Sequence, residues 1–178
     1  MARHVVLLRG INLAGRNRVA MPELRKALEE AGFEDIRTYV QSGNVVLSSE
    51  AAPATVAREC EQLIAERFGL NIDVVVRTRD EVAEVVRRNP LGEVASDPKR
   101  YQVTFLDGKL DRDAVKKLEA AAADEEQFVV DGREVYAWTP AGVARSKLWS
   151  TLAGRSLGVT ATSRNWTTVT KLLELADG

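Results

Sequence analysis

The segment YVQSGNVVL, residues 39–47, places two apolar runs on either side of a polar turn sequence. Ser-Gly between apolar runs is typical of a turn between antiparallel strands, and a glycine at position 43 accommodates a positive φ. We take Ser42-Gly43 as a two-residue hairpin loop, which pairs Gln41 with Asn44. This register places the side chains of Gln41 and Asn44 on a polar, accessible face of the sheet. It leaves the opposite, apolar face to pack on helices.

The segments on both sides of this hairpin predict a ferredoxin-like order of elements. Residues 4–10 (HVVLLRG) form a continuous apolar run that is typical of a central strand. Helical patterns over residues 21–32 and 55–69 precede and follow the hairpin, and a fourth strand comes at residues 72–77. The order strand-helix-strand-strand-helix-strand, over residues 1–79, is the split βαβ pattern.

Residues 80–178 show a similar order. After a helix at residues 79–90 and a loop at 91–100, we expect a strand at 101–106, a helix at 111–123, a hairpin at 126–138, a short helix at 142–154 and a last helix at 162–176. The hairpin turns at Asp131-Gly132, and Thr162 or Ser163 caps the last helix. The predicted fold class is therefore α+β. A ferredoxin-like βαββαβ half (1–79) and a related βαββα half with C-terminal helices (80–178) pack as one compact unit, and we ascribe their similarity to structural duplication.

The composition argues against several kinds of binding site. The 178 residues are 45% hydrophobic and 29% charged, which is typical of a globular protein. The net charge of -1 provides no overall field that would attract nucleic acid or anionic lipid. One cysteine, Cys60, and one histidine, His4, exclude an intramolecular disulfide and do not supply the paired ligands of a structural zinc site. We expect no metal and no cofactor, and we place Cys60 in the core.

No segment reaches the ~20 apolar residues that a membrane span needs. The apolar run near the N-terminus is too short for a signal peptide and lacks a small-residue cleavage site. We therefore expect a cytoplasmic protein that does not contact membranes, and the sequence leaves its oligomeric state open.

The topology predicts one candidate site. In a ferredoxin-like sheet the third strand runs antiparallel beside the first, so the 41–44 turn lies at the edge where the first strand ends. We expect polar residues of two segments to converge there: Arg9, Asn12, Arg16, Asn17, Arg18, Gln41, Ser42 and Asn44. Arginines, amides and flexible glycine backbone suit an anion, above all phosphate. The loop has neither the Walker A nor the GxGxxG pattern. Alternatively, Asn and Gly shape the turns and the arginines, Arg9 included, are simply solvated.

A second basic cluster is predicted near the C-terminus. If residues 162–176 are helical, Arg164, Thr168 and Lys171 share one face at i, i+4 and i+7. Arg145 and Lys147 add two further cations, and a helix N-terminus can hold an anion. The alternative is a solvated face on a capped helix, with the charged tip of Arg164 accessible.

Four short motifs carry a resemblance to a known family. They are RGIN (9–12), QSGN (41–44), RSKL (145–148) and RNW (164–166), in this order. The chain resembles, over essentially its whole length, the bacterial domain-of-unknown-function family 1697. The resemblance implies an α+β, ferredoxin-like fold with a duplicated arrangement, and it implies no activity.

These features favour a small-ligand binding module for a phosphate-bearing or other anionic ligand. Nucleic acid is a weaker candidate, because the first strand offers only Val and Leu where RNA-binding sheets present aromatic residues. An enzyme is a further alternative, with Asp73 as a candidate acid, but no nucleophile motif, carboxylate pair or metal cluster supports a reaction. The last alternative is a structural or protein-interaction domain that associates through an open sheet edge or an apolar patch.

Overall fold

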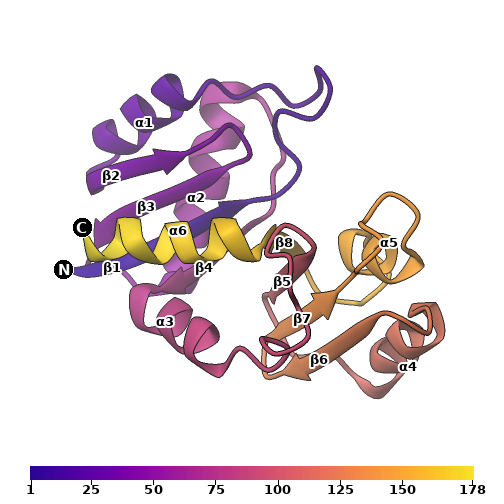
Figure 1. Ribbon diagram of the computed structural model, residues 1–178. Coiled ribbons are helices and arrows are strands. Elements are labelled where there is room, and N and C mark those ends of the chain that lie inside the picture. The colour runs from indigo at the N-terminus through magenta and orange to yellow at the C-terminus, as the bar shows by residue number, and fades with distance from the viewer. The chain divides into compact units, whose positions relative to one another are not determined.

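The computed structural model describes residues 1–178, which form eight strands and six helices. The chain divides into two compact units. The first comprises Met1–Glu84 together with Lys171–Gly178, and the second comprises Val85–Thr170. Figure 1 shows their elements. No helix is both long enough and apolar enough to cross a membrane.

The first unit contains a four-stranded antiparallel sheet with the strand order β2-β3-β1-β4. Its elements are β1 (Ala2–Leu8), α1 (Met21–Glu30), β2 (Glu34–Tyr39), β3 (Asn44–Ser49), α2 (Pro53–Phe68) and β4 (Val74–Thr78). This is the ferredoxin-like arrangement, and it confirms the predicted βαββαβ order and the adjacency of the first and third strands. Helices α1 and α2 lie on one face of the sheet (Figure 1).

The two faces of this sheet alternate along each strand. Val6 and Leu8 of β1 point into the core formed with α1 and α2, where Cys60 is also buried as predicted. The opposite face was expected to be polar, and that expectation is wrong at its centre. Val5 and Val46 on that face are at most 1% exposed, so this sheet is buried on both sides.

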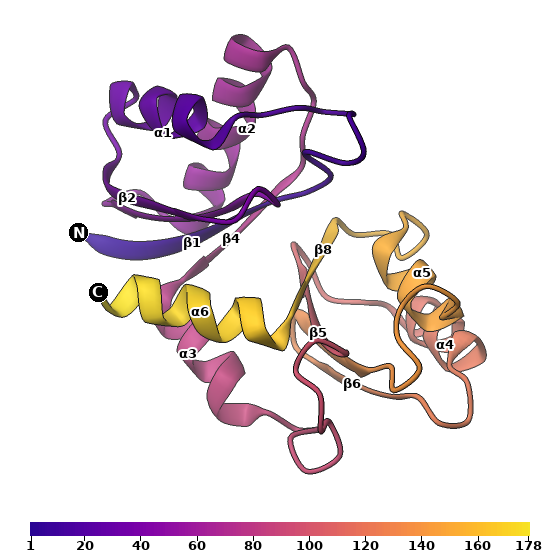
Figure 2. The same ribbon diagram turned by 45° about the horizontal axis from the view of Figure 1, so that its top comes forward.

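The end of α6 (Trp166–Asp177) explains part of this burial. Figures 1 and 2 both place residues 171–178 alongside β1. Arg3 donates to the carbonyls of Leu175 and Ala176, at 3.3 and 3.5 Å. Arg79 lies 2.6 Å from the Asp177 carboxylate. The arginines of the first unit thus hold the carboxyl end of the helix, where cations are favoured.

The second unit repeats the arrangement, with the strand order β6-β7-β5-β8. Its elements are β5 (Tyr101–Leu106), α4 (Arg112–Ala121), β6 (Gln127–Asp131), β7 (Glu134–Trp138), α5 (Lys147–Ala153) and β8 (Ala161–Asn165). Leu106, Leu118, Leu148 and Leu152 are fully buried in its core. Helix α3 (Arg79–Arg88) contains the boundary between residues 84 and 85, and α6 contains the boundary between 170 and 171.

The C-terminal segment differs from the prediction. Residues 161–165 form β8, so the second half is βαββαβ rather than βαββα, and the last helix begins at Trp166 instead of Thr162. Asn165 is the residue whose side chain caps it, because its Oδ1 accepts from the amide of Thr168 at 2.9 Å. The hydroxyls of Thr104 and Ser163 lie 2.7 Å apart across β5 and β8. Pairing with β5 therefore decides the structure of a segment that local pattern made helical.

Candidate functional site

The β1–α1 loop and the β2–β3 turn meet at one edge of the first sheet. The amide of Leu8 donates to the carbonyl of Gly43 at 2.9 Å. The Asn12 side chain donates to the carbonyl of Gln41 at 2.6 Å. Figures 1 and 2 show the loop extending beyond the end of β1 beside that turn. The sheet topology therefore brings together the two segments that the sequence singled out.

The turn is longer than the predicted two-residue loop. Tyr39, not Gln41, pairs with Asn44, so residues 40–43 form the connection. The shift of two residues keeps the paired side chains of residues 37–39 and 44–46 on their predicted faces, because the period of a strand is two. Val40 is an exception, because it was expected opposite Val45 on the apolar face and instead lies in the turn, 55% exposed. Val40 and Gly43 both have positive φ, 52° and 82°. The carbonyl of Gly43 bonds to β1 and draws the turn toward the neighbouring strand.

The tip of the β1–α1 loop is a small hairpin. Leu13 and Arg16 exchange two backbone hydrogen bonds, of 3.0 and 2.7 Å. Between them Ala14 and Gly15 have φ values of 43° and 83°. Positive φ at both central residues matches a type I′ turn, which closes two-residue hairpins. The loop is thus a hydrogen-bonded structure with a defined shape.

Two asparagines lock this hairpin to its surroundings. The Asn12 side chain accepts from the amide of Val19 at 2.8 Å and donates to its carbonyl at 2.9 Å, in addition to its bond to Gln41. Asn17 donates to the carbonyl of Gly10 at 2.9 Å. The side-chain amides of Asn12 and Asn17 are therefore engaged in holding the backbone, which agrees with the structural alternative for these two residues.

Asn44 and Arg9 are also less available than expected. Asn44 is fully buried and donates to the carbonyl of Tyr39 and the hydroxyl of Ser42, at 3.1 and 3.0 Å. The Arg9 side chain is only 15% exposed, and its Nη1 lies 3.9 Å from the carboxylate of Asp73. The expectation that both would be accessible is wrong, because the sheet face that carries Asn44 is covered.

Apart from Ala14 and Asn17, six side chains are exposed at this edge, and we call them the loop patch: Leu13, Arg16, Arg18, Val40, Gln41 and Ser42. The guanidinium groups of Arg16 and Arg18 make no ion pair or hydrogen bond within the chain. Leu13 and Val40 are each 55% exposed. The patch combines two free cations with two exposed aliphatic side chains.

The backbone beneath the patch is unusual. Four of the six non-glycine residues with positive φ in the whole chain belong to these two segments: Asn12, Ala14, Asn17 and Val40. Asparagine adopts the left-handed region at little cost, whereas alanine and the β-branched valine adopt it rarely and only under strain. Such residues cost on the order of 1–3 kcal/mol each and cluster at functional sites. The concentration of this backbone at one edge therefore marks the edge as a candidate site.

The residues of the second predicted basic cluster do not lie on one face of a helix. Arg164 lies on β8 in the second unit, whereas Lys171 lies on α6 among the residues of the first. Arg164 donates to the hydroxyl of Thr162 and the carbonyl of Ser163, at 2.8 and 2.9 Å, and burial lowers its pKa to about 10. The expectation that its charged tip would be accessible is therefore wrong.

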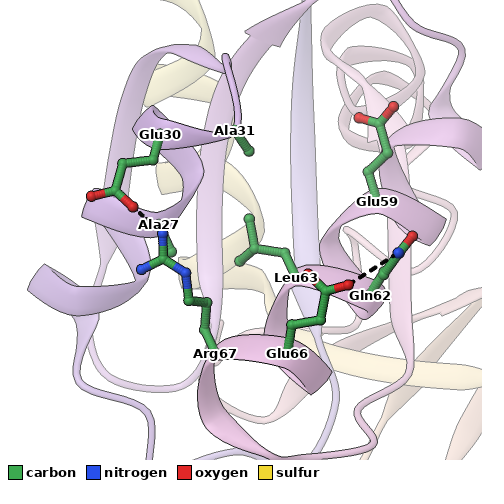
Figure 3. Close-up of a pocket in the computed structure, with 8 residues that line it drawn as sticks. All are labelled: Ala27, Glu30, Ala31, Glu59, Gln62, Leu63, Glu66 and Arg67. Carbon is green, nitrogen blue, oxygen red and sulfur yellow. Dashed lines mark hydrogen bonds and ion pairs between the residues drawn. The ribbon is translucent and has the colours of Figure 1, made fainter.

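An open depression between α1 and α2 is a feature that the sequence reasoning missed. It has a volume of about 360 Å³, and Figure 3 shows acidic side chains around Leu63. Glu30 forms an ion pair with Arg67, and Glu66 accepts from Gln62 at 3.2 Å. These residues have the pattern of two solvated helix faces, so no sequence signal separates them from ordinary surface. No group of three or more His, Cys, Asp or Glu residues could hold a metal ion.

Comparison with known proteins extends the description. The model of the family described as "Protein of unknown function (DUF1697)" matches residues 1–136, which include the whole loop patch. The solved structure of the conserved bacterial protein SP0830 from Streptococcus pneumoniae is similar, with a TM-score of 0.79 and 22% sequence identity over 98% of each chain. At this identity the likeness shows the fold alone, and it covers both halves. A comparison with curated proteins gave no match.

Proposed function

Because the chain belongs to the DUF1697 family of proteins of unknown function, its role must be inferred from its own surface, and we propose that it is a binding module for an anionic ligand. The site is the loop patch. The observation that carries the proposal is the pair of free guanidinium groups, Arg16 and Arg18, on a hydrogen-bonded loop.

The chemistry of the patch suits phosphate or carboxylate groups. A guanidinium offers several N–H donors in a planar fork that matches both groups, and charge-assisted hydrogen bonds are roughly twice as strong as neutral ones. The side chains of Gln41 and Ser42 are exposed in the turn that the Asn12 hydrogen bond joins to this loop, and they supply neutral hydrogen-bonding groups. The patch holds no carboxylate or imidazole that could act as a general acid or base or activate the Ser42 hydroxyl, which favours binding over catalysis.

The local structure lowers the cost of binding. Asn12 and the Leu13–Arg16 bonds hold the loop backbone in one conformation, so little backbone entropy remains to be lost when a ligand binds. The whole chain has a net charge of -1, so the attraction comes from the two local charges. We therefore expect binding to weaken as salt concentration rises.

A thermal-shift screen with phosphate, nucleotides and acidic peptides tests the proposal. A ligand at ~100 times its dissociation constant stabilises the folded protein by about 2.7 kcal/mol. We expect the double substitution Arg16→Gln and Arg18→Gln to remove this stabilisation. The matched control is Arg58→Gln with Arg112→Gln, which removes the same charge at two exposed positions on α2 and α4. Equal losses in both double variants, or no stabilisation by any anion, would contradict the proposal.

A further inference from the structure

We infer that the anionic ligand of the loop patch is a polypeptide segment in which acidic side chains flank an apolar one. The inference rests on the proposed function and names the class of partner. Its basis is the placement of Leu13 and Val40 among the arginines of the same exposed surface.

Exposed aliphatic side chains are concentrated at this edge. Only four large hydrophobic residues of the chain are exposed: Met1, Leu13, Val40 and Val94. Two of them, Leu13 and Val40, belong to the patch. The Asn12 bond to the Gln41 carbonyl joins the chain neighbours of these two residues, so their backbones are held near each other. Exposed apolar surface rimmed by polar groups is a feature of protein-binding sites, and we take this pair as the apolar part of such a site.

A small phosphorylated molecule would leave this component unused. Small-ligand sites are concave and bury most of the ligand, whereas all six residues of the patch are exposed and the hairpin extends beyond the sheet. Nucleic acid is equally poorly matched. Single strands stack their bases on aromatic side chains, and none of the six patch residues is aromatic.

An acidic and apolar segment uses both the cations and the aliphatic side chains of the patch. Its carboxylates pair with Arg16 and Arg18, and its apolar side chain covers Leu13 and Val40. Arginine is enriched at the centres of protein interfaces, where such pairs are shielded from water. Burial of the exposed half of one aliphatic side chain strengthens binding by about tenfold. The charges determine that an acidic segment binds, and the aliphatic pair determines which one.

Selection from a displayed library of random 12-residue peptides tests the inference while the natural partner is still unidentified. We expect the peptides selected on the wild-type protein to contain at least two Asp or Glu residues next to Leu, Ile or Phe. An enriched peptide is then labelled and titrated, together with a charge-matched version in which Ser replaces the apolar residue. Leu13→Ser is expected to weaken binding of the enriched peptide about tenfold and to leave binding of its Ser version unchanged.

Three controls separate the possible outcomes. Val94→Ser removes an exposed aliphatic side chain outside the patch and should change nothing. Arg16→Gln with Arg18→Gln should abolish binding of both peptides. Inorganic phosphate, a single-stranded RNA and phosphatidylserine vesicles are titrated in parallel as alternative anions. The thermal unfolding of each variant is recorded, so that a folding defect is recognised.

Two results would overturn the inference in different ways. If the arginines are required but Leu13→Ser has no effect, or if phosphate, RNA or vesicles bind more tightly than any selected peptide, the ligand is anionic but not an acidic, apolar segment. The proposed function would then stand alone. If no probe depends on Arg16 and Arg18, both the inference and the proposed function fail.

Discussion

Replacement of Gly43 by alanine tests the contact that joins the two segments of the site. An ideal Cβ at this position would lie 2.8 Å from Cβ of Leu8 and 3.1 Å from its carbonyl oxygen. Leu8 cannot move away easily, because it is 2% exposed in the core and its amide donates to the Gly43 carbonyl at 2.9 Å. The φ of 82° adds a second obstacle, because residues other than glycine rarely adopt it.

The expected loss has two parts. The left-handed conformation costs a residue with a Cβ about 1–2 kcal/mol, and forcing extra volume into a packed site costs about 1–3 kcal/mol. Gly43→Ala should therefore lower the free energy of unfolding by about 3 kcal/mol. Gly15→Ala is a matched control, because Gly15 has a φ of 83° but no atom within 4 Å of an added Cβ. Gly15→Ala should therefore lower the free energy of unfolding only by the cost of the left-handed conformation, about 1–2 kcal/mol.

Urea unfolding monitored by far-UV circular dichroism measures both variants. Tryptophan fluorescence is unsuitable, because Trp138, Trp149 and Trp166 all belong to the second unit, whereas both glycines belong to the first. With a slope of about 2 kcal/mol per molar urea, the two midpoints should differ by roughly 1 M. Equal losses in the two variants would show that the close approach of Gly43 to β1 contributes nothing, which would contradict this account of the turn.

Three further outcomes are expected. Asn12→Ala should lower the free energy of unfolding by about 1–3 kcal/mol, because three hydrogen bonds are lost. Arg16→Gln should change it by no more than about 0.5 kcal/mol. Comparable losses in urea melts of the two variants would contradict the structural role of Asn12. Burial raises the pKa of the Cys60 thiol to about 12, so a thiol reagent at pH 8 should not react with the native protein and should react once urea unfolds it; rapid native reaction would place the thiol at the surface. Burial also raises the pKa of Tyr101 from 10.0 to about 12 and raises the pKa of Tyr136, so between about pH 10 and 12 the unfolded chain releases phenol protons that the folded chain retains, and stability should fall as pH rises through this window. Unfolding at pH 11 should then increase the tyrosinate absorbance near 295 nm, and no increase would contradict the burial of these phenols.

Much of the fold was predictable from residues that are near one another in the sequence. The apolar runs in residues 45–47 and 5–8 predicted two strands, and the paired residues kept their predicted faces even though the hairpin register was shifted by two. Val40 did not, because the shift moved it out of the strand and into the turn. The burial of Cys60 followed from helical spacing in α2. Such patterns are local, so one sequence suffices to recognise them.

Residues 161–165 show where local pattern was insufficient. Their side chains fit either the first turn of a helix or an edge strand, and β5 offers unpaired backbone groups that only a strand can satisfy. The same limit applied to Arg164, which the helical interpretation placed on an exposed face and which burial has desolvated. A segment whose sequence fits two local structures adopts the one in which its backbone pairs with neighbouring elements.

For the candidate site too, one part was predictable from the sequence and another part depends on the folded structure. The meeting of residues 9–18 with residues 41–44 was predictable from the amino-acid order, because the succession of strands and helices dictates which ends share a sheet edge. Which side chains remain free depends instead on contacts made in the folded chain. Asn12, Asn17 and Asn44 bond to backbone carbonyls, and Arg9 lies beside Asp73. Arg16 and Arg18 meet no such partner. The identity of a polar side chain states which bonds it can make, and its neighbours in space determine whether those bonds are already made within the chain or left for a ligand.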